Sequence, residues 1–246
     1  MTEEVLNGIV LYTADLKEYD KRLVVLTKER GKITVFANGA RRPNSPLRAA
    51  SRSFTMGRFT VFPGRESYTL KKAEITEYFE AIEQDVEKLC YASYFCELMS
   101  YYTREGDACV NHLNLLYLAK QALIRENLSY GLIRNIYELK LMDLEGEALH
   151  AFDCVKCGSK DKLTFFSEEA GGFLCETCGD KLQANVKMSN TLVYAVRYIL
   201  AKPLPELFSF TLSPEAEREL SRITERFVHK YVDKEFKSLE ILGGLL

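Results

Sequence analysis

Two Cys-x2-Cys pairs are the residues of this sequence best suited to the chemistry of a site. Cys154 and Cys157 form the first pair, Cys175 and Cys178 form the second, and 17 residues separate them. Thiolates three residues apart can turn inward together, and two such turns complete a tetrahedron around zinc with bonds of about 2.3 Å. Because four thiolates leave no coordination position open, the spacing predicts one structural Zn²⁺.

Other interpretations of the cysteines stay open at this point. The four thiols could be unrelated buried side chains or could form a redox pair, and His150 lies near enough in sequence to replace one ligand. A glycine follows the second cysteine of each pair, and it would let the backbone turn tightly enough for its amides to face the sulfurs. Cys90, Cys96 and Cys109 have no such spacing, and we interpret them as core residues.

The elements that must hold the cysteines are a small hairpin inside a helical region. Between the two pairs, 163–166 and 172–174 have the composition of short strands. Helical periodicity and capping residues predict helices from about 86 to 100, 110–127, 129–145, from Ser189 or Asn190 to 200, and from Ser213 to about 240.

Short strands dominate the N-terminal 75 residues. Five runs of β-branched and aromatic residues alternate with turn formers, which favours a small closed antiparallel barrel of the OB-fold type. The fold class predicted for the whole chain is therefore α+β: an OB-fold barrel, then an α-helical domain with an inserted four-cysteine zinc module. The expected boundaries are 1–75 for the barrel, 76–149 and 183–246 for the helical domain, and 150–182 for the insert.

Charge is distributed unevenly, although the net charge of the 246 residues is only −2. Residues 1–72 hold 14 Lys/Arg against 7 Asp/Glu, and between Arg30 and Lys72 there are ten basic residues and one acid. Such a run is typical of nucleic-acid binding, whereas the alternative is a basic surface that is merely solvated. The candidate nucleic-acid-binding residues are Lys32, Arg41, Arg42, Arg48, Arg52 and Arg58.

Four aromatic residues of the barrel are available to stack on bases, although most barrel aromatics belong to a core: Phe36, Phe54, Phe59 and Tyr68. Contacts to four to six phosphates would give a slope of log K against log salt of roughly −3 to −4 on a single strand. No pattern in the sequence indicates a residue that reads base edges, so we expect little sequence preference.

Features that the sequence lacks argue against several function classes. No uncharged stretch approaches the roughly 20 residues of a membrane span, and the acidic N-terminus does not resemble a secretion signal, so we expect a cytoplasmic protein. The nucleotide-binding and hydrolase motifs are missing, and only three histidines occur. We therefore expect a protein that is not an enzyme.

Cations recur every four residues along the predicted last helix. Arg218, Arg222, Arg226 and Lys230 accompany apolar positions that include Phe227. The simpler interpretation is a solvated face that covers the core. The alternative is an apolar groove with a basic rim that accepts an acidic peptide, with these five residues as partner-binding candidates.

Taken together, these features resemble the RecO family of bacterial recombination mediators over essentially the whole chain. The segments that carry the resemblance are Thr27-x3-Gly31-Lys32, Asn38-Gly39-Ala40-Arg41-Arg42 with Ser45, Leu47 and Arg48, Phe54, Glu138–Met142, Cys154–Gly158 and Phe236–Leu239. The loop and the four-cysteine insert together are fairly specific, and neither would be alone.

The resemblance implies a function in recombination and DNA repair. It implies binding of single-stranded and double-stranded DNA, annealing of complementary strands, and cooperation with RecR to load RecA onto DNA covered by single-strand binding protein (SSB). It also implies contact with the acidic C-terminal tail of SSB and a location at the nucleoid. Two rival hypotheses remain, namely an RNA-binding accessory factor of translation or transcription built from the same parts, and a zinc-dependent enzyme.

Overall fold

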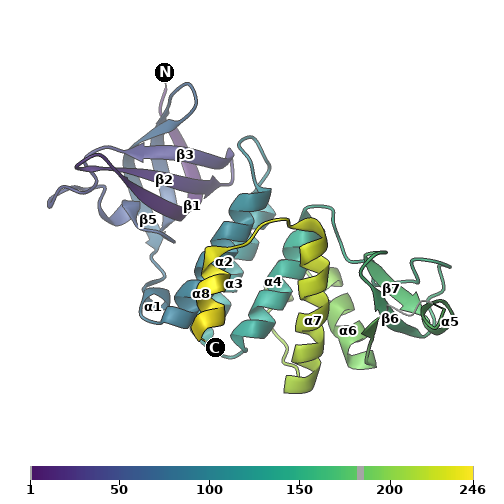
Figure 1. Cartoon of the computed structure of the whole chain (residues 1–246). Helices are drawn as coiled ribbons and strands as arrows, with labels where there is room; N and C mark the ends of the chain where they lie inside the picture. The colour runs from purple at the N-terminus through teal and green to yellow at the C-terminus, as the bar shows by residue number, and fades with distance from the viewer. Residues whose placement is uncertain (1, 182–185, 246) are drawn as a thin grey trace. The chain divides into compact units, whose positions relative to one another are not determined.

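The computed structural model describes residues 2–181 and 186–245, which fall into two compact units. Unit 1 comprises Met1–Lys120 and Phe236–Leu246, and unit 2 comprises Gln121–Glu235. Figure 1 follows the chain from the strands through the helices to the four-cysteine insert and the last helix. This division is coarser than the three predicted domains, whose boundaries stay predictions.

A closed five-stranded barrel forms the N-terminal part of unit 1. Its strands are β1 (Glu4–Leu16), β2 (Asp20–Thr27), β3 (Gly31–Ala37), β4 (Met56–Pro63) and β5 (Tyr68–Glu77). They close in the order β1-β2-β3-β5-β4, with β3 and β5 parallel and the other pairs antiparallel. The predicted barrel is confirmed, and β1 and β5 are longer than predicted.

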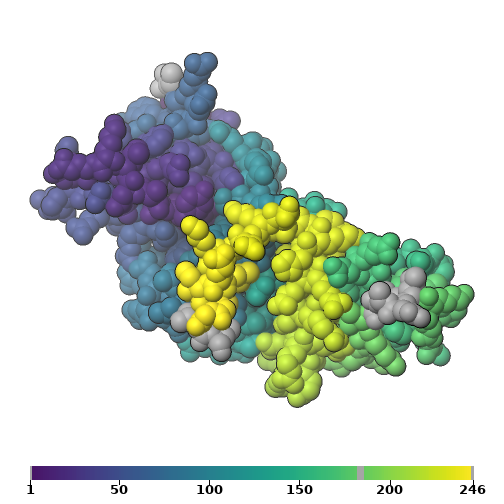
Figure 2. All heavy atoms as spheres, viewed as in Figure 1, coloured from purple at the N-terminus to yellow at the C-terminus, as the bar shows by residue number. Residues whose placement is uncertain are grey.

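Alternation along the strands builds the barrel core. In β3, Ile33, Val35 and Ala37 are buried while the residues between them are partly exposed. Their inward side chains pack with Val10, Phe59 and other apolar residues of the remaining strands. Figure 2 shows the N-terminal strands, in purple, on an outer surface of this unit.

Helices complete unit 1. They are α1 (Glu80–Glu83), α2 (Val86–Tyr102), most of α3 (Val110–Arg125) and α8 (Lys237–Leu245), with α8 packed on α2. Inside this unit, the ammonium group of the fully buried Lys120 lies 3.6 Å from the centroid of the Phe54 ring and 5.5 Å from that of Phe79. Burial lowers the pKa of Lys120.

The predicted last helix is two helices. α7 spans Pro214–Tyr231, begins at the predicted cap Ser213, and ends where Val232 adopts an extended conformation. The chain runs without helical structure from 232 to 236 before α8 begins. Phe236 is buried against Tyr94 at 5.4 Å between ring centroids, so tertiary packing within unit 1 overrides the helical periodicity.

Unit 2 combines a helical layer with the cysteine insert. The helices are α4 (Tyr130–Leu144), α6 (Asn190–Ala201, capped by Ser189) and α7, and hydrogen bonds cross between them from Asn135 to Ser221 and from Lys140 to the Leu200 carbonyl. The insert contains β6 (Leu163–Ser167), β7 (Gly172–Cys175), α5 (Glu176–Gly179) and the short β8 (Val186–Lys187). The predicted hairpin is confirmed, and β8 is an addition to it.

Among the described residues, no helix combines the length and the apolarity that crossing a membrane requires.

Candidate nucleic-acid surface and metal centre

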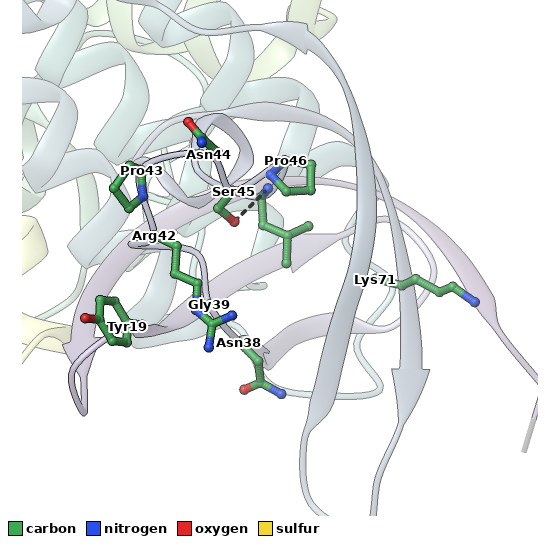
Figure 3. Close-up of a pocket in the computed structure, with 10 residues that line it drawn as sticks. Tyr19, Asn38, Gly39, Arg42, Pro43, Asn44, Ser45, Pro46 and Lys71 are labelled. Carbon is green, nitrogen blue, oxygen red and sulfur yellow. Dashed lines mark hydrogen bonds between the residues drawn. The ribbon is translucent and has the colours of Figure 1, made fainter.

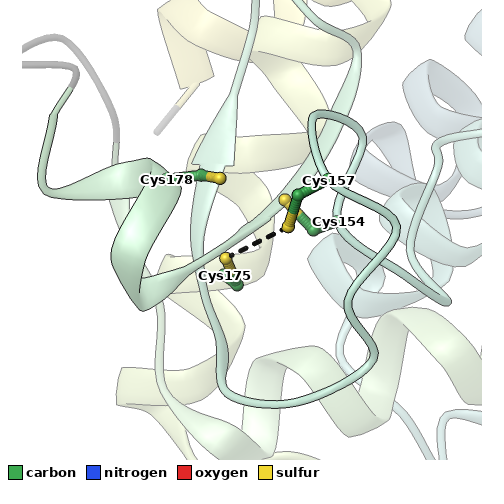
Figure 4. A group of neighbouring side chains, drawn as sticks. All are labelled: Cys154, Cys157, Cys175 and Cys178. Carbon is green, nitrogen blue, oxygen red and sulfur yellow. Dashed lines mark hydrogen bonds between the residues drawn. The ribbon is translucent and has the colours of Figure 1, made fainter.

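The four cysteine sulfurs meet in one cluster at the edge of the insert. Their Sγ atoms all lie within 4.8 Å of one another, and those of Cys157 and Cys175 are 3.7 Å apart. Zinc–sulfur bonds of about 2.3 Å at tetrahedral angles place the sulfurs about 3.8 Å apart. The cluster in Figure 4 therefore has the dimensions of a four-thiolate metal site, and the donor set suits zinc.

Backbone turns position the first pair of cysteines. The Cys154 carbonyl accepts a hydrogen bond from the Gly158 amide at 2.8 Å, and the Cys154 amide donates to the Ser159 carbonyl at 2.7 Å. Gly158 has a φ of 72°, a conformation that glycine adopts without strain, as the sequence predicts. At the second pair Gly179 is needed for another reason: a Cβ there would lie 2.1 Å from the Phe165 ring.

The pKa values of Cys154 and Cys178 are shifted in opposite directions. Burial raises the pKa of Cys154, but backbone amides of Cys175, Cys157 and Lys156 outweigh burial and lower it to about 6. Hydrogen bonds with the Cys175 and Cys157 sulfurs raise the pKa of Cys178 to about 12. A divalent cation at the centre would remove this penalty on further ionisation.

His150 is not part of the cluster. Its Nε2 atom is hydrogen-bonded to the Asp153 carboxylate, and among the described residues only the four cysteines gather as a metal site. The possibility that His150 replaces a ligand is therefore not supported. Cys90, Cys96 and Cys109 are buried in unit 1, which confirms them as core residues.

A loop of consecutive turns connects β3 to β4 and carries most of the predicted DNA-binding arginines. Along the loop, backbone amides donate to the carbonyl of the residue three positions earlier, at 3.1–3.3 Å. These bonds run from Arg42 to Gly39, from Ser45 to Arg42, from Arg48 to Ser45 and from Ser51 to Arg48. Pro43 and Pro46 each occupy the second position of a turn, where their fixed φ is favourable. We call residues 38–55 the basic loop.

Apolar residues fasten the basic loop to the barrel. Ala40, Leu47 and Ala50 are buried in the barrel core, whereas the neighbouring Arg41 and Arg48 are exposed. Bonds from the loop to the β1–β2 turn add to this anchoring, since the Gly39 amide donates to Asp20 at 2.7 Å and the Arg41 amide donates to the Tyr19 carbonyl at 2.9 Å. The cations therefore stand on a preorganised backbone.

Two cavities border the basic loop. Hollow A, about 780 Å³, is drawn in Figure 3; hollow B is about 830 Å³. They share part of the loop, because Pro43, Ser45 and Pro46 line both. The other residues of hollow A are Tyr19, Asn38, Gly39, Arg42, Asn44, Leu47 and Lys71, and those of hollow B are Asp15, Lys21, Ala40, Arg41, Arg48, Ala49 and Arg52.

The six predicted DNA-binding residues do not share one environment. Arg42 and Arg48 are exposed, and in the described part of the chain neither forms an ion pair with a carboxylate. Arg41 lies 3.4 Å from the Asp15 carboxylate, and Arg52 is bridged to Glu83. These four residues line the two hollows.

The other two predicted residues lie apart from the hollows. Arg58 on β4 pairs with Glu74 on the neighbouring strand β5, and this hydrogen bond lowers the pKa of Glu74. The Lys32 ammonium donates to the Ser100 carbonyl and hydroxyl of α2. The structure does not bring Lys32 and Arg58 together with the loop arginines, so both are left out of the proposed surface.

Acidic residues from outside the basic run partly neutralise it. Six of its ten cations pair with carboxylates of the flanking segments: Arg30 with Glu4, Arg41 with Asp15, Arg52 with Glu83, Lys71 with Glu3, and Arg58 and Lys72 with Glu74. The paired cations have side-chain exposures of 38–65%. Exposed pairs contribute about 0–1 kcal/mol each, so an incoming phosphate can replace the carboxylate.

Most of the aromatic residues suggested for stacking are unavailable for it. Phe54 and Phe59 are buried at 3% and 1% exposure, and Tyr68 is buried with its hydroxyl bonded to Glu105. Phe36 is partly exposed on β3. Tyr19 was not predicted as a stacking residue, although it is 41% exposed; an aromatic residue in the short turn between two strands was the available signal.

The predicted partner-binding residues of α7 are divided by burial. Arg218, Arg222 and Arg226 are exposed, although Arg218 lies 3.5 Å from Glu215. Phe227 is fully buried, and the Lys230 ammonium donates to the Glu169 carbonyl at 2.7 Å. Phe227 thus belongs to the core because it lies on the inward face of the helix, and it cannot line an open groove.

Both parts of the chain match known families. Residues 1–79 match the model described as Recombination protein O N terminal, and residues 83–240 match Recombination protein O C terminal. A DNA repair protein RecO from Alkaliphilus metalliredigens is 33% identical over 236 residues, covering 95% of this chain and 96% of the relative. Proteins of the same name from Desulforamulus reducens and Acetivibrio thermocellus are 31% and 29% identical, covering 98% and 97% of this chain and 94% and 96% of the relatives.

Proposed function

This chain belongs to the RecO family of DNA repair proteins, and on that premise we propose that its basic loop binds DNA and anneals complementary strands. Single-stranded and double-stranded DNA are both substrates, since phosphates rather than base edges provide the main contacts. The protein acts by binding and performs no covalent chemistry.

The observation that carries this proposal is the preorganised pair Arg42 and Arg48. Both guanidinium groups project from a loop of sequential turns that is anchored in the barrel core, and both lack carboxylate partners among the described residues. Because the backbone is already ordered, little conformational entropy is lost when a phosphate binds.

Annealing follows from neutralisation of phosphates. Two complementary strands repel each other, and cations placed on both sides of the basic loop lower that repulsion while the strands come into contact. Arg41 and Arg52 can then exchange their exposed carboxylate partners for phosphates, which adds contacts as the second strand arrives.

We further propose that the four cysteines hold one Zn²⁺ as a structural ion. The support is the distance between the sulfurs and the complete thiolate set, which leaves no open position for a substrate. The residues that hold the ion are Cys154, Cys157, Cys175 and Cys178, and the metal adds to the burial of apolar side chains such as Phe166 and Phe173 in the small insert.

The family also suggests protein partners. We propose that the chain works with RecR, binds the acidic C-terminal tail of SSB, and thereby assists loading of RecA at the nucleoid in the cytoplasm. The exposed α7 residues Arg222 and Arg226 are candidates for the acidic tail, with Arg218 as a weaker one. An acidic tail peptide should bind less tightly to the Arg222→Glu and Arg226→Glu double variant.

The DNA proposal is tested by salt titration with the Arg42→Ala and Arg48→Ala double variant. We expect affinity for a single strand to fall roughly tenfold, the slope of log K against log salt to decrease by about 1.4, and annealing to slow. A matched control is the Arg125→Ala and Lys187→Ala variant, which removes two exposed cations elsewhere.

Two results would count against the proposal. An unchanged salt slope in the loop variant would mean that the DNA site lies elsewhere. Stronger competition by RNA than by single-stranded DNA of equal length would favour the RNA-binding hypothesis instead.

A further inference from the structure

We propose that hollow A is a base-binding subsite, in which an unpaired nucleobase stacks on the Tyr19 ring, while hollow B takes phosphates alone. The inference rests on the proposed function and deepens it, because it assigns different chemistry to the two sides of the basic loop. It also identifies Tyr19 as the residue that distinguishes a single strand from a duplex.

The residues of the two hollows differ in kind. Hollow A contains one aromatic ring and two amide side chains, Tyr19, Asn38 and Asn44. Hollow B contains four cations, Lys21, Arg41, Arg48 and Arg52, and no aromatic residue. Rings and amides suit the face and edge of a base, whereas closely spaced cations suit the backbone.

Tyr19 has the geometry of a stacking platform. The residue is 41% exposed, and the Arg42 guanidinium carbon lies over the ring, 5.6 Å from its centroid. A guanidinium plane and an aromatic ring can both stack on a base, so Arg42 adds a second planar surface beside the ring. In Figure 3 the Tyr19 ring and the Arg42 side chain lie near one another at the border of the hollow.

The backbone that carries the ring is fixed by hydrogen bonds to the basic loop. The Tyr19 carbonyl accepts the Arg41 amide at 2.9 Å, and the neighbouring Asp20 carboxylate accepts the Gly39 amide at 2.7 Å. The β1–β2 turn is therefore tied to the basic loop at Tyr19 and at the residue that follows it. An exposed aromatic side chain on an ordered backbone contributes little to the core and is available for stacking.

The amides explain why such a subsite tolerates any base. Asn38 and Asn44 are exposed, and each offers both a donor and an acceptor. Side chains of this kind can adapt to different base edges, unlike a bidentate arginine directed at guanine. Lys71, the other cation of hollow A, is bound to Glu3 and lies 5.0 Å from the Phe62 ring, so Arg42 is the cation available beside the base.

The test compares three probes on the full chain: a deoxythymidine oligomer, an abasic sugar–phosphate oligomer of equal length, and a DNA duplex. We expect Tyr19→Ala to weaken binding of the thymidine oligomer roughly 5- to 100-fold and to leave abasic and duplex DNA within about twofold. Tyr19→Phe keeps the ring and should bind all probes like the wild type. Arg48→Ala, in hollow B, should weaken the thymidine and abasic oligomers by the same factor.

Each other outcome has a definite meaning. Equal weakening of both oligomers by Tyr19→Ala would show that the ring only supports the loop, and it would overturn the inference. No weakening of either oligomer, with normal binding by the wild type, would overturn the subsite and leave the proposed function standing. If the wild type binds no DNA, the proposed function is wrong, and the proposal of a base-binding subsite is wrong as well.

Discussion

The four-cysteine insert and the basic loop achieve order in different ways. The insert combines a small sheet with turns that bring four sulfurs within 4.8 Å of one another, whereas the loop consists of turns that bury Ala40, Leu47 and Ala50 in the barrel. Ordering of the insert should therefore depend on an ion, while ordering of the loop depends on apolar packing. The loop can therefore leave most of its arginine side chains exposed, because apolar packing keeps the loop folded.

Removal of the metal should produce the largest effect and would sharpen this contrast. We expect Cys154→Ser, or a strong chelator, to reduce bound zinc from one ion per chain to none and to expose residues 150–181 to proteolysis. The basic loop should still bind single-stranded DNA, because unit 1 contains it entirely. Metal analysis and limited proteolysis measure the first effect.

A matched control for this prediction is Cys90→Ser, which changes a buried thiol of unit 1 and should keep the zinc. A fully folded insert without metal would contradict the prediction. Loss of DNA binding together with the zinc would mean that the two regions are not independent.

Truncation of Leu47, which anchors the basic loop in the barrel core, should have an effect of intermediate size. Leu47→Ala should lower the free energy of unfolding by about 2–3 kcal/mol, since a buried leucine is truncated at the edge of the core. DNA affinity should fall as well, because the flanking arginines lose their fixed positions. Denaturant titration measures the stability. The control is Arg48→Ala, a change at a neighbouring exposed residue, which should reduce DNA affinity and leave the stability unchanged.

Neutralising a carboxylate should give the smallest effect, and in the opposite direction. Glu83→Gln removes the nearer carboxylate partner of Arg52, whose other partner Glu80 lies 4.0 Å away, and should raise affinity for single-stranded DNA about two- to fivefold, since an exposed pair is worth up to about 1 kcal/mol. The control is Glu87→Gln, which makes the same change of charge on α2. Equal gains from both variants would mean that overall charge, and not competition for Arg52, controls affinity.

The two regions also differ in how far the sequence could predict them. The metal site depends on spacing within about 25 residues, so Cys154, Cys157, Cys175 and Cys178 could all be named from the sequence. The charge of the basic loop depends on Asp15 and Glu83, which lie outside the basic run. Counting cations along the chain could not show which of them these acids neutralise.

Tertiary packing accounts for the remaining differences. The barrel follows from short runs of β-branched and aromatic residues separated by turn formers, and it was predicted. Phe54 has the composition of a stacking residue, but the buried Lys120 holds its ring at 3.6 Å, and that contact joins residues far apart in the sequence. The end of α7 at Tyr231 could not be predicted from the sequence either, because the interruption of the helix depends on the burial of Phe236 against Tyr94.

The return of the chain to its first unit after α7 has a consequence for synthesis. Phe236, Ser238 and Leu242 are buried in unit 1, and the Ser238 hydroxyl donates to Glu97 at 2.6 Å. A ribosome adds these residues only after all of unit 2, at about 5–20 residues per second, so unit 1 cannot close until unit 2 has been synthesised. Until then the facing side of α2 stays uncovered, and a nascent chain that stalls near residue 235 should be a preferred client of chaperones.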